Sequence, residues 1–187
     1  MINLEEDAQD FGELSRTDEG LRIEHLADHV DAIPTLASWI LEEWGYSFAD
    51  GTFEELISEF ERRTIPHTIP ETFVALEGDR CVGTASIVAR DMSIRPELSP
   101  WLAAVYVVPE CRSKGIGTKL ARSAMLEAET LGLDKLYLFT PDRRDFYGSL
   151  GWHVCEHVAY RGVGVVIMQY QVRGSSLSVG RGHRWNR

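Results

Sequence analysis

The chain has 187 residues, 44% of them hydrophobic and 26% charged, which is typical of one globular unit large enough to bury a sizeable apolar core. Its net charge is −10; residues 1–20 hold seven acids and one arginine, and residues 173–187 hold four arginines and no acid, so the segment between them carries −8. An acidic surface repels nucleic acid and attracts cations, so the charge disfavours a nucleic-acid-binding protein and favours a cationic amine as partner.

The two ends of the chain differ from the rest. Residues 1–20 are polar and acidic and residues 173–187 are rich in Gly, Ser and Arg, so we predict mobile tails on either side of one domain at 21–172. The start lacks the basic-then-apolar pattern of a secretion signal, and no apolar run reaches the roughly 20 residues of a membrane span. We therefore expect a cytoplasmic protein, in which three widely spaced cysteines are reduced thiols.

The sequence of the first half of the domain predicts a strand, two helices and a hairpin. Residues 21–26 alternate as a short strand does, and apolar residues then recur at helical spacing over 33–44. A second helix follows the capping box formed by Thr52 and Glu55. Two strands within 72–92, joined by a tight turn, complete this half as a hairpin.

The second half alternates strands with helices. A nearly all-apolar strand, as expected for one buried on both faces, leads into a long helix, and a later short helix has Asp142 as its predicted N-cap. The whole order is β-α-α-β-β-β-α-β-α-β-β, which indicates a mixed α/β fold. The elements of this half are expected at 101–108, 116–131, 135–140, 143–150, 152–161 and 163–172.

The loop between the apolar strand and the long helix has the makeup of an anion site. The first amides of a helix lack intrahelical partners and carry partial positive charge, so they attract anions. Gly115 and Gly117 remove side chains that would keep a phosphate away, while Arg112 and Lys114 add positive charge. The spacing matches neither a P-loop nor a dinucleotide fingerprint, and an ordinary strand-to-helix loop stays open as the alternative at this point.

Two segments together resemble a known family. The stretch VYVVPECRSKGIGTKL (105–120) is similar to V-x-P-x-x-R-x-x-G-x-G, the acetyl-coenzyme A motif of the GNAT superfamily of N-acetyltransferases. The stretch RRDFYGSLGWHV (143–154) resembles the F-Y-x-x-L-G-[FW] segment of the same family. The resemblance covers about residues 21–172. It implies a mixed, mostly antiparallel sheet of about seven strands flanked by about four helices, with acetyl-coenzyme A as cosubstrate and an amine acceptor on a small molecule or a protein.

The resemblance also implies roles for particular residues. The backbone of Val105 and Val107 holds the pantetheine arm, and the amide of Val107 is the candidate oxyanion donor. Tyr147 is the candidate general acid; Phe146 and Leu150, four residues apart, are expected to form the core face of the short helix and to turn Tyr147 to another side. The pyrophosphate cradle is implied to consist of the backbone amides of Arg112, Ser113, Lys114, Gly115, Ile116, Gly117 and Thr118.

The general base is not evident in the sequence. Many relatives carry a glutamate on the central strand, but residues 101–107 contain no carboxylate, and Thr140 stands where many relatives have an asparagine. His67, Asp91 and Glu97 are polar candidates nearby, but a surface or capping role fits each of them better than that of a base. A catalytically silent acyl-coenzyme A binding module therefore stays open as an alternative to the enzyme. A nucleic-acid binder that uses the Arg-rich tail is a further, disfavoured one.

Aromatic and histidine residues supply the last candidates. Four aromatic residues are expected near the acceptor pocket, because aromatic walls suit amines. Trp39 and Trp44 lie on or beside the apolar helix face, so at least one of these two is expected in the core instead. The histidine pairs 25/29 and 153/157 have helical metal-ligand spacing, but they fall in predicted strands or a strand-helix junction without a third ligand, so no metal is expected. We also expect a monomer or homodimer that binds neither nucleic acid nor membrane. The aromatic residues are Trp39, Trp44, Tyr46 and Trp101.

Overall fold

One seven-stranded sheet organises the protein. The structure is a computed structural model that describes residues 20–45 and 52–172, so nearly all of both predicted tails lies outside it. The strand order is β1-β2-β3-β4-β5-β7-β6, and every neighbouring pair is antiparallel except β4 and β5. This confirms the predicted fold class. The strands are β1 (Leu21–His25), β2 (Glu71–Glu77), β3 (Arg80–Val88), β4 (Trp101–Val107), β5 (Lys135–Thr140), β6 (His153–Tyr160) and β7 (Val163–Gln171).

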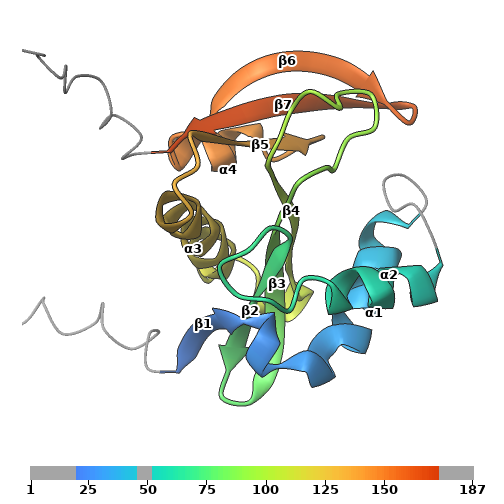
Figure 1. Cartoon of the computed structure of the whole chain (residues 1–187), viewed down its shortest axis with the longest axis vertical. Coiled ribbons are helices and arrows are strands. Elements are labelled where there is room, and N and C mark those ends of the chain that lie inside the picture. The colour runs from blue at the N-terminus through green and yellow to red at the C-terminus, as the bar shows by residue number, and fades with distance from the viewer. Residues whose placement is uncertain (1–19, 46–51, 173–187) are drawn as a thin grey trace, which may run out of the picture.

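Helices cover both faces of the first half of the sheet (Figure 1). Alternate residues of β2 face opposite ways, as the strand period requires: Val74 and Leu76 pack in the cluster of α1 and α2, whereas Phe73 and Ala75 pack in the cluster of α3. None of the described helices is long and apolar enough to cross a membrane. The helices are α1 (Ile33–Trp44), α2 (Phe53–Glu61), α3 (Ile116–Thr130) and α4 (Arg144–Ser149).

The sheet opens between its two parallel strands. β4 and β5 pair at one position, Trp101 opposite Tyr137, and then diverge, so that β5, β7 and β6 form a second half-sheet at an angle to the first (Figure 1). A register shift against β3 and a left-handed Ala104 (φ 51°) mark a bulge in β4 just before this opening. The prediction that this strand is buried on both faces is wrong for its second half: Val105 and Val107 are half-buried because the neighbouring strand has moved away.

The predicted capping box at the start of α2 is confirmed. The Thr52 hydroxyl accepts a hydrogen bond from the Glu55 amide at 3.3 Å, and the Glu55 carboxylate accepts one from the Thr52 amide at 2.6 Å. Thr52→Ala is expected to lower the free energy of unfolding by about 1 kcal/mol, because it leaves a helix-end donor without its partner. Denaturant unfolding measures this. Ser58→Ala, an exposed change inside the same helix, is the control, and equal effects of the two changes would contradict the prediction.

Candidate active site

The start of α3 has the geometry of an anion site. Gly115 is its N-cap with φ 79°, and Ser113 is also left-handed, with φ 64°. Left-handed residues let successive backbone amides converge on one concave side, and glycine adopts that conformation without strain. The first intrahelical bond of the turn runs from the Lys119 amide to the Gly115 carbonyl, at 3.1 Å. No side chain caps the helix and its first turn contains no acid, so the earlier amides are available to a bound anion.

The basic side chains of this loop are engaged with the protein itself. Arg112 donates from Nε to the Val107 carbonyl at 2.9 Å, lies 3.2 Å from a Glu43 carboxylate oxygen, and has its guanidinium carbon 5.4 Å from the Tyr106 ring centre. Lys114 is exposed, with its ammonium 3.9 Å from a carboxylate oxygen of Glu77. These positions favour the backbone amides, rather than the side-chain charges, as the main contacts for a phosphate.

The end of β4 presents its backbone to the opening. The Val108 amide donates to the Val82 carbonyl of β3 at 3.0 Å. Backbone groups alternate in direction along a strand, so the amide and carbonyl of Val107 face away from β3, toward the β5 side. A Cβ placed on Gly117 comes within 3.8 Å of Val107 Cγ2, so this part of the strand also borders the first turn of α3. The strand end and the helix end therefore form two adjoining walls of one opening.

The short helix α4 differs from the prediction. Phe146 and Leu150 are half-buried and pack against the core as predicted, but Tyr147 is itself in the core with 8% exposure, so the prediction that it turns to another side is wrong. The chain turns immediately after this helix, and the Trp152 amide donates back to the Tyr147 carbonyl at 3.2 Å, which brings the Trp152 and Tyr147 rings together at 6.0 Å. Phe146 also reaches the cradle: its Cζ lies 3.7 Å from a Cβ placed on Gly117.

Two further details of α4 affect its chemistry. Burial raises the pKa of Tyr147 above the ordinary value for tyrosine, because the phenolate would be desolvated. Asp142 is not the N-cap that the sequence predicts; Thr140, at the end of β5, accepts a hydrogen bond from the Arg143 amide at 3.0 Å. The Thr140 hydroxyl is therefore used in the turn between β5 and α4, and Thr140 is 4% exposed.

The three candidate bases lie in different surroundings. His67 bonds to Glu127 near the end of α3, remote from the cradle, and Glu97 is exposed in the loop between β3 and β4. Asp91, in the same loop, has its pKa raised to about 6 by desolvation, with the positive charge of Arg63 acting in the opposite direction. A carboxylate of this pKa can accept a proton near neutral pH. So can His67, whose pKa is raised from its ordinary value by the hydrogen bond to Glu127.

The aromatic candidates divide between core and surface. Trp101 is 0% exposed and packs against Tyr137, so its predicted place in a pocket wall is wrong. Trp39 stacks on Tyr106 at 5.2 Å and Trp44 approaches the same ring edge-on at 6.1 Å. Tyr46 lies outside the described residues.

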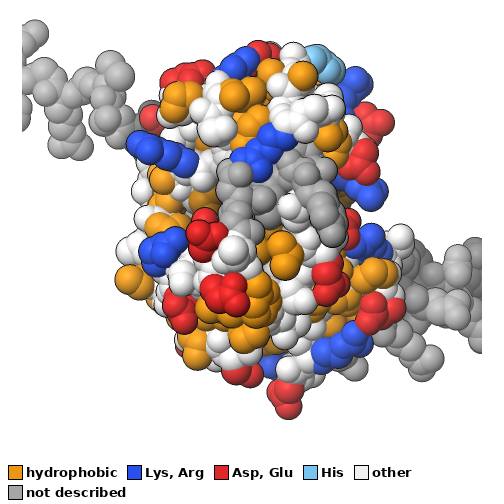
Figure 2. Space-filling view, turned by 90° about the vertical axis from the view of Figure 1, so that its right-hand side faces the viewer, with side chains coloured by type: hydrophobic (Ala, Val, Ile, Leu, Met, Phe, Trp, Pro, Cys, Tyr) orange, Lys and Arg blue, Asp and Glu red, His pale blue; other side chains and the backbone are white. Residues whose placement is uncertain are grey.

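A hollow of about 630 Å³ lies beside the stacked pair of Trp39 and Tyr106, on the α1 side of the sheet. Acidic side chains lie among apolar ones on this side of the molecule (Figure 2). Carboxylates beside aromatic rings suit a cationic amine. The acidic residues that line the hollow are Asp31, Glu42, Asp79 and Glu110, of which Glu110 is paired with Arg80, a basic residue of the same lining.

Comparison with known proteins agrees with the fold and the two motifs. Residues 33–152 match the model of the acetyltransferase (GNAT) family. N-alpha-acetyltransferase 30 of Schizosaccharomyces pombe is 32% identical over 103 residues, which cover 52% of this chain and 68% of that protein.

Solved structures share the fold at lower identity. The yncA protein of Salmonella typhimurium, solved with its cofactor acetyl-CoA, has a TM-score of 0.65 at 19% identity and covers 84% of this chain and 96% of its own. An N-acetyltransferase from Staphylococcus aureus Mu50 has a TM-score of 0.64 at 15% identity, and the match covers 82% of this chain and 99% of that protein. The chain belongs to the GNAT family of acetyltransferases, which transfer acetyl from acetyl-coenzyme A to an amine.

Proposed function

We propose that acetyl transfer takes place in the opening between β4 and β5. The amides of residues 113–118 hold the pyrophosphate of acetyl-coenzyme A, whereas the Arg112 amide already donates to the Pro109 carbonyl at 3.2 Å. The backbone of Val105 and Val107 holds the pantetheine arm. The observation that carries this proposal is the uncapped N-terminus of α3 directly beside the diverging strands. Both features supply backbone donors at one place, which is what an extended phosphorylated thioester requires.

The reaction in this site is a direct transfer. A neutral amine attacks the thioester carbonyl carbon, and the resulting oxyanion accepts a hydrogen bond from the Val107 amide. The carbon–sulfur bond then breaks, the amide product forms, and coenzyme A leaves as a thiolate. The Tyr147 hydroxyl donates a hydrogen bond to the sulfur as its negative charge develops, and solvent protonates the thiolate after it leaves. Solvent or Asp91 takes the proton that the amine loses.

We further infer that the acceptor is the α-amino group of a polypeptide. With a typical pKa of about 7.8, an α-amine is deprotonated at pH 7 at a cost of roughly 1 kcal/mol, against roughly 4.6 kcal/mol for a lysine side chain with a pKa near 10.4. β4 carries no carboxylate that could meet the larger cost. The similarity to an N-alpha-acetyltransferase supports the same class of acceptor.

Matched peptides test the acceptor. We expect kcat/KM to be at least about tenfold higher for a peptide with a free N-terminus and no lysine than for the same peptide with a blocked N-terminus and one lysine. The rate with the first should rise with pH through the amine pKa of about 7.8 and level off near pH 9, where nearly all of the amine is neutral. Thiol release and product mass measure both. A preference for the lysine peptide would refute the acceptor, whereas acetyl-coenzyme A binding without turnover of any amine would indicate the silent module.

The domain limits, the cellular location and the oligomeric state are also proposals. The limits of the domain at 21–172, with tails at 1–20 and 173–187, rest on the charge and composition of the sequence. A cytoplasmic location and a lack of nucleic-acid binding are proposed from the sequence as well. A monomer or homodimer is proposed together with them. The family match within 33–152 is consistent with a single acetyltransferase domain.

A further inference from the structure

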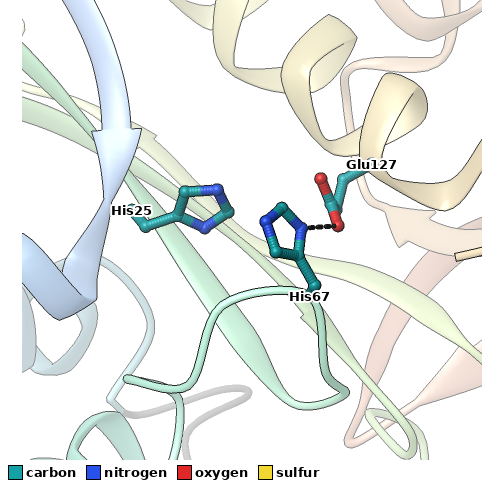
Figure 3. Close-up of side chains that lie close together, drawn as sticks. All are labelled: His25, His67 and Glu127. Atoms are coloured by element: carbon teal, nitrogen blue, oxygen red, sulfur yellow. Dashed lines mark hydrogen bonds and ion pairs between the residues drawn. The ribbon is translucent and has the colours of Figure 1, made fainter. Parts of the chain in front are cut away.

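Three metal-ligating side chains from distant parts of the chain meet on the α3 side of the sheet. His25 ends β1, His67 lies in the loop between α2 and β2, and Glu127 lies near the end of α3. Each offers one ligand atom, and these atoms all lie within 4.8 Å of one another. Figure 3 shows His67 between the other two, with one ring nitrogen toward Glu127 and the other toward His25.

The geometry of the two imidazoles fits a shared ion. Their ring centres are 5.2 Å apart and their planes are inclined by 70°. Two imidazoles on one tetrahedral zinc, with Zn–N bonds of about 2.0–2.1 Å, place their ring centres roughly 5 Å apart. His67 Nδ1 is 2.7 Å from a carboxylate oxygen of Glu127, shorter than the separation of two ligands on zinc. The His67 side chain is 62% exposed and belongs to a loop, so it has room to rotate toward an ion.

A buried carboxylate supplies the second, independent observation. Glu71 is 1% exposed; its Oε2 accepts a hydrogen bond from the His67 amide at 3.1 Å and lies 3.4 Å from His25 Nδ1. Its Oε1 and the Nδ1 atom of His25 are both buried and have no hydrogen-bond partner within the described part of the chain. A buried carboxylate beside a histidine ring is the usual partner of a metal-binding imidazole, because it fixes the orientation of the ring.

We propose that His25, His67 and Glu127 bind one divalent transition-metal ion, with Zn²⁺ as the best match to two imidazoles and a carboxylate. Glu71 is a positioning residue, because it holds the His67 backbone and lies against the His25 ring. The site is separate from acetyl transfer: Glu127 is ten residues beyond Gly117, or about 15 Å along the axis of α3. The ion links β1, the α2–β2 loop and α3, which gives it a structural role.

Zinc titration of the full chain tests the site. After removal of metal by a chelator, the protein is expected to bind one Zn²⁺ in competition with a chromophoric chelator and to melt at a higher temperature when Zn²⁺ is present. His67→Ala and Glu127→Gln should each weaken Zn²⁺ binding by at least about tenfold and abolish the gain in melting temperature. The control is His29→Asn, which changes a histidine already paired with Glu24 at 2.5 Å and should leave Zn²⁺ affinity unchanged.

Two outcomes overturn the site. The first is that the wild type binds Zn²⁺ no more tightly than His67→Ala does. The second is that His29→Asn loses as much Zn²⁺ affinity as His67→Ala. If a variant does not fold, the wild type alone decides: Co²⁺ bound here should show the intense visible absorption of a tetrahedral complex, and its absence on saturation refutes the ligand set. Acetyl-coenzyme A binding should be the same with and without Zn²⁺, which separates this site from the transfer site.

Discussion

Gly117→Val is expected to weaken acetyl-coenzyme A binding about a hundredfold, a loss of roughly 2.7 kcal/mol, because it fills the cradle without changing its charge. Gly117 is the second residue of α3, and a Cβ there lies 3.7 Å from Phe146 Cζ and 3.8 Å from Val107 Cγ2. These are ordinary contacts, so one carbon fits. The two methyl groups of valine have to occupy the space beside them, where the helix-end amides meet the end of β4.

Lys114→Ala is expected to weaken binding less than about fivefold, because an exposed lysine contributes at most about 1 kcal/mol and is screened by salt. Titration calorimetry with acetyl-coenzyme A measures both variants, and Gly117→Ala should fall between Gly117→Val and the wild type. Thermal unfolding of each variant checks that the fold is retained. A larger loss for Lys114→Ala than for Gly117→Val would show that side-chain charge, rather than the amide cradle, holds the pyrophosphate.

Local signals predicted most of the elements of the fold. The helix at 33–44 and the capping box at Thr52 are bounded by residues that act within one turn, so neighbouring sequence was sufficient. The order of the last strands was not predictable in this way. β7 pairs with both β5 and β6, and that choice depends on contacts between segments far apart in the chain.

The site shows the same division between local and distant information. A short run of residues was enough to predict a glycine-containing loop and a helix end with unpartnered amides, whereas the left-handed conformation of Gly115 is seen only in the structure. The pairing of Arg112 with Glu43 joins residues 69 apart, and the meeting of His67 with Glu127 joins residues 60 apart. Nothing in a single sequence marks such partners. The cluster of His25, His67 and Glu127 likewise forms only in the folded chain, because its members come from β1, the α2–β2 loop and α3.

The misjudged face of α4 has a different cause. A helical-face argument assumes that neighbouring turns of one helix decide what is buried. α4 has six residues, and the chain reverses at Gly151, which is left-handed with φ 94°, so Trp152 folds back onto Tyr147. The packing of Tyr147 is therefore decided by a residue outside the helix. The signal was present in the sequence as the glycine directly before a tryptophan.

The burial of Tyr147 leads to the second large effect. Tyr147→Phe is expected to lower kcat about a hundredfold while changing the KM for acetyl-coenzyme A less than about threefold, since the hydroxyl acts on the departing thiolate rather than on the bound thioester. Because burial raises the pKa of Tyr147, the hydroxyl stays protonated throughout the usual assay range. The rate should therefore show no fall from ionisation of this residue up to about pH 10.

The raised pKa also determines how the proton moves. A thiolate with a pKa near 8.5, by analogy with cysteine, is a weaker base than a tyrosinate with a pKa above 10, so complete transfer from Tyr147 is uphill by more than roughly 2 kcal/mol. We therefore expect Tyr147 to stabilise the sulfur by a hydrogen bond as charge develops, with the proton exchanging with solvent after coenzyme A departs. Tyr137→Phe is the matched control, because Tyr137 is also 8% exposed but packs against Trp101 on β4. If both substitutions lower kcat equally, or neither does, the hydroxyl of Tyr147 has no part in the reaction.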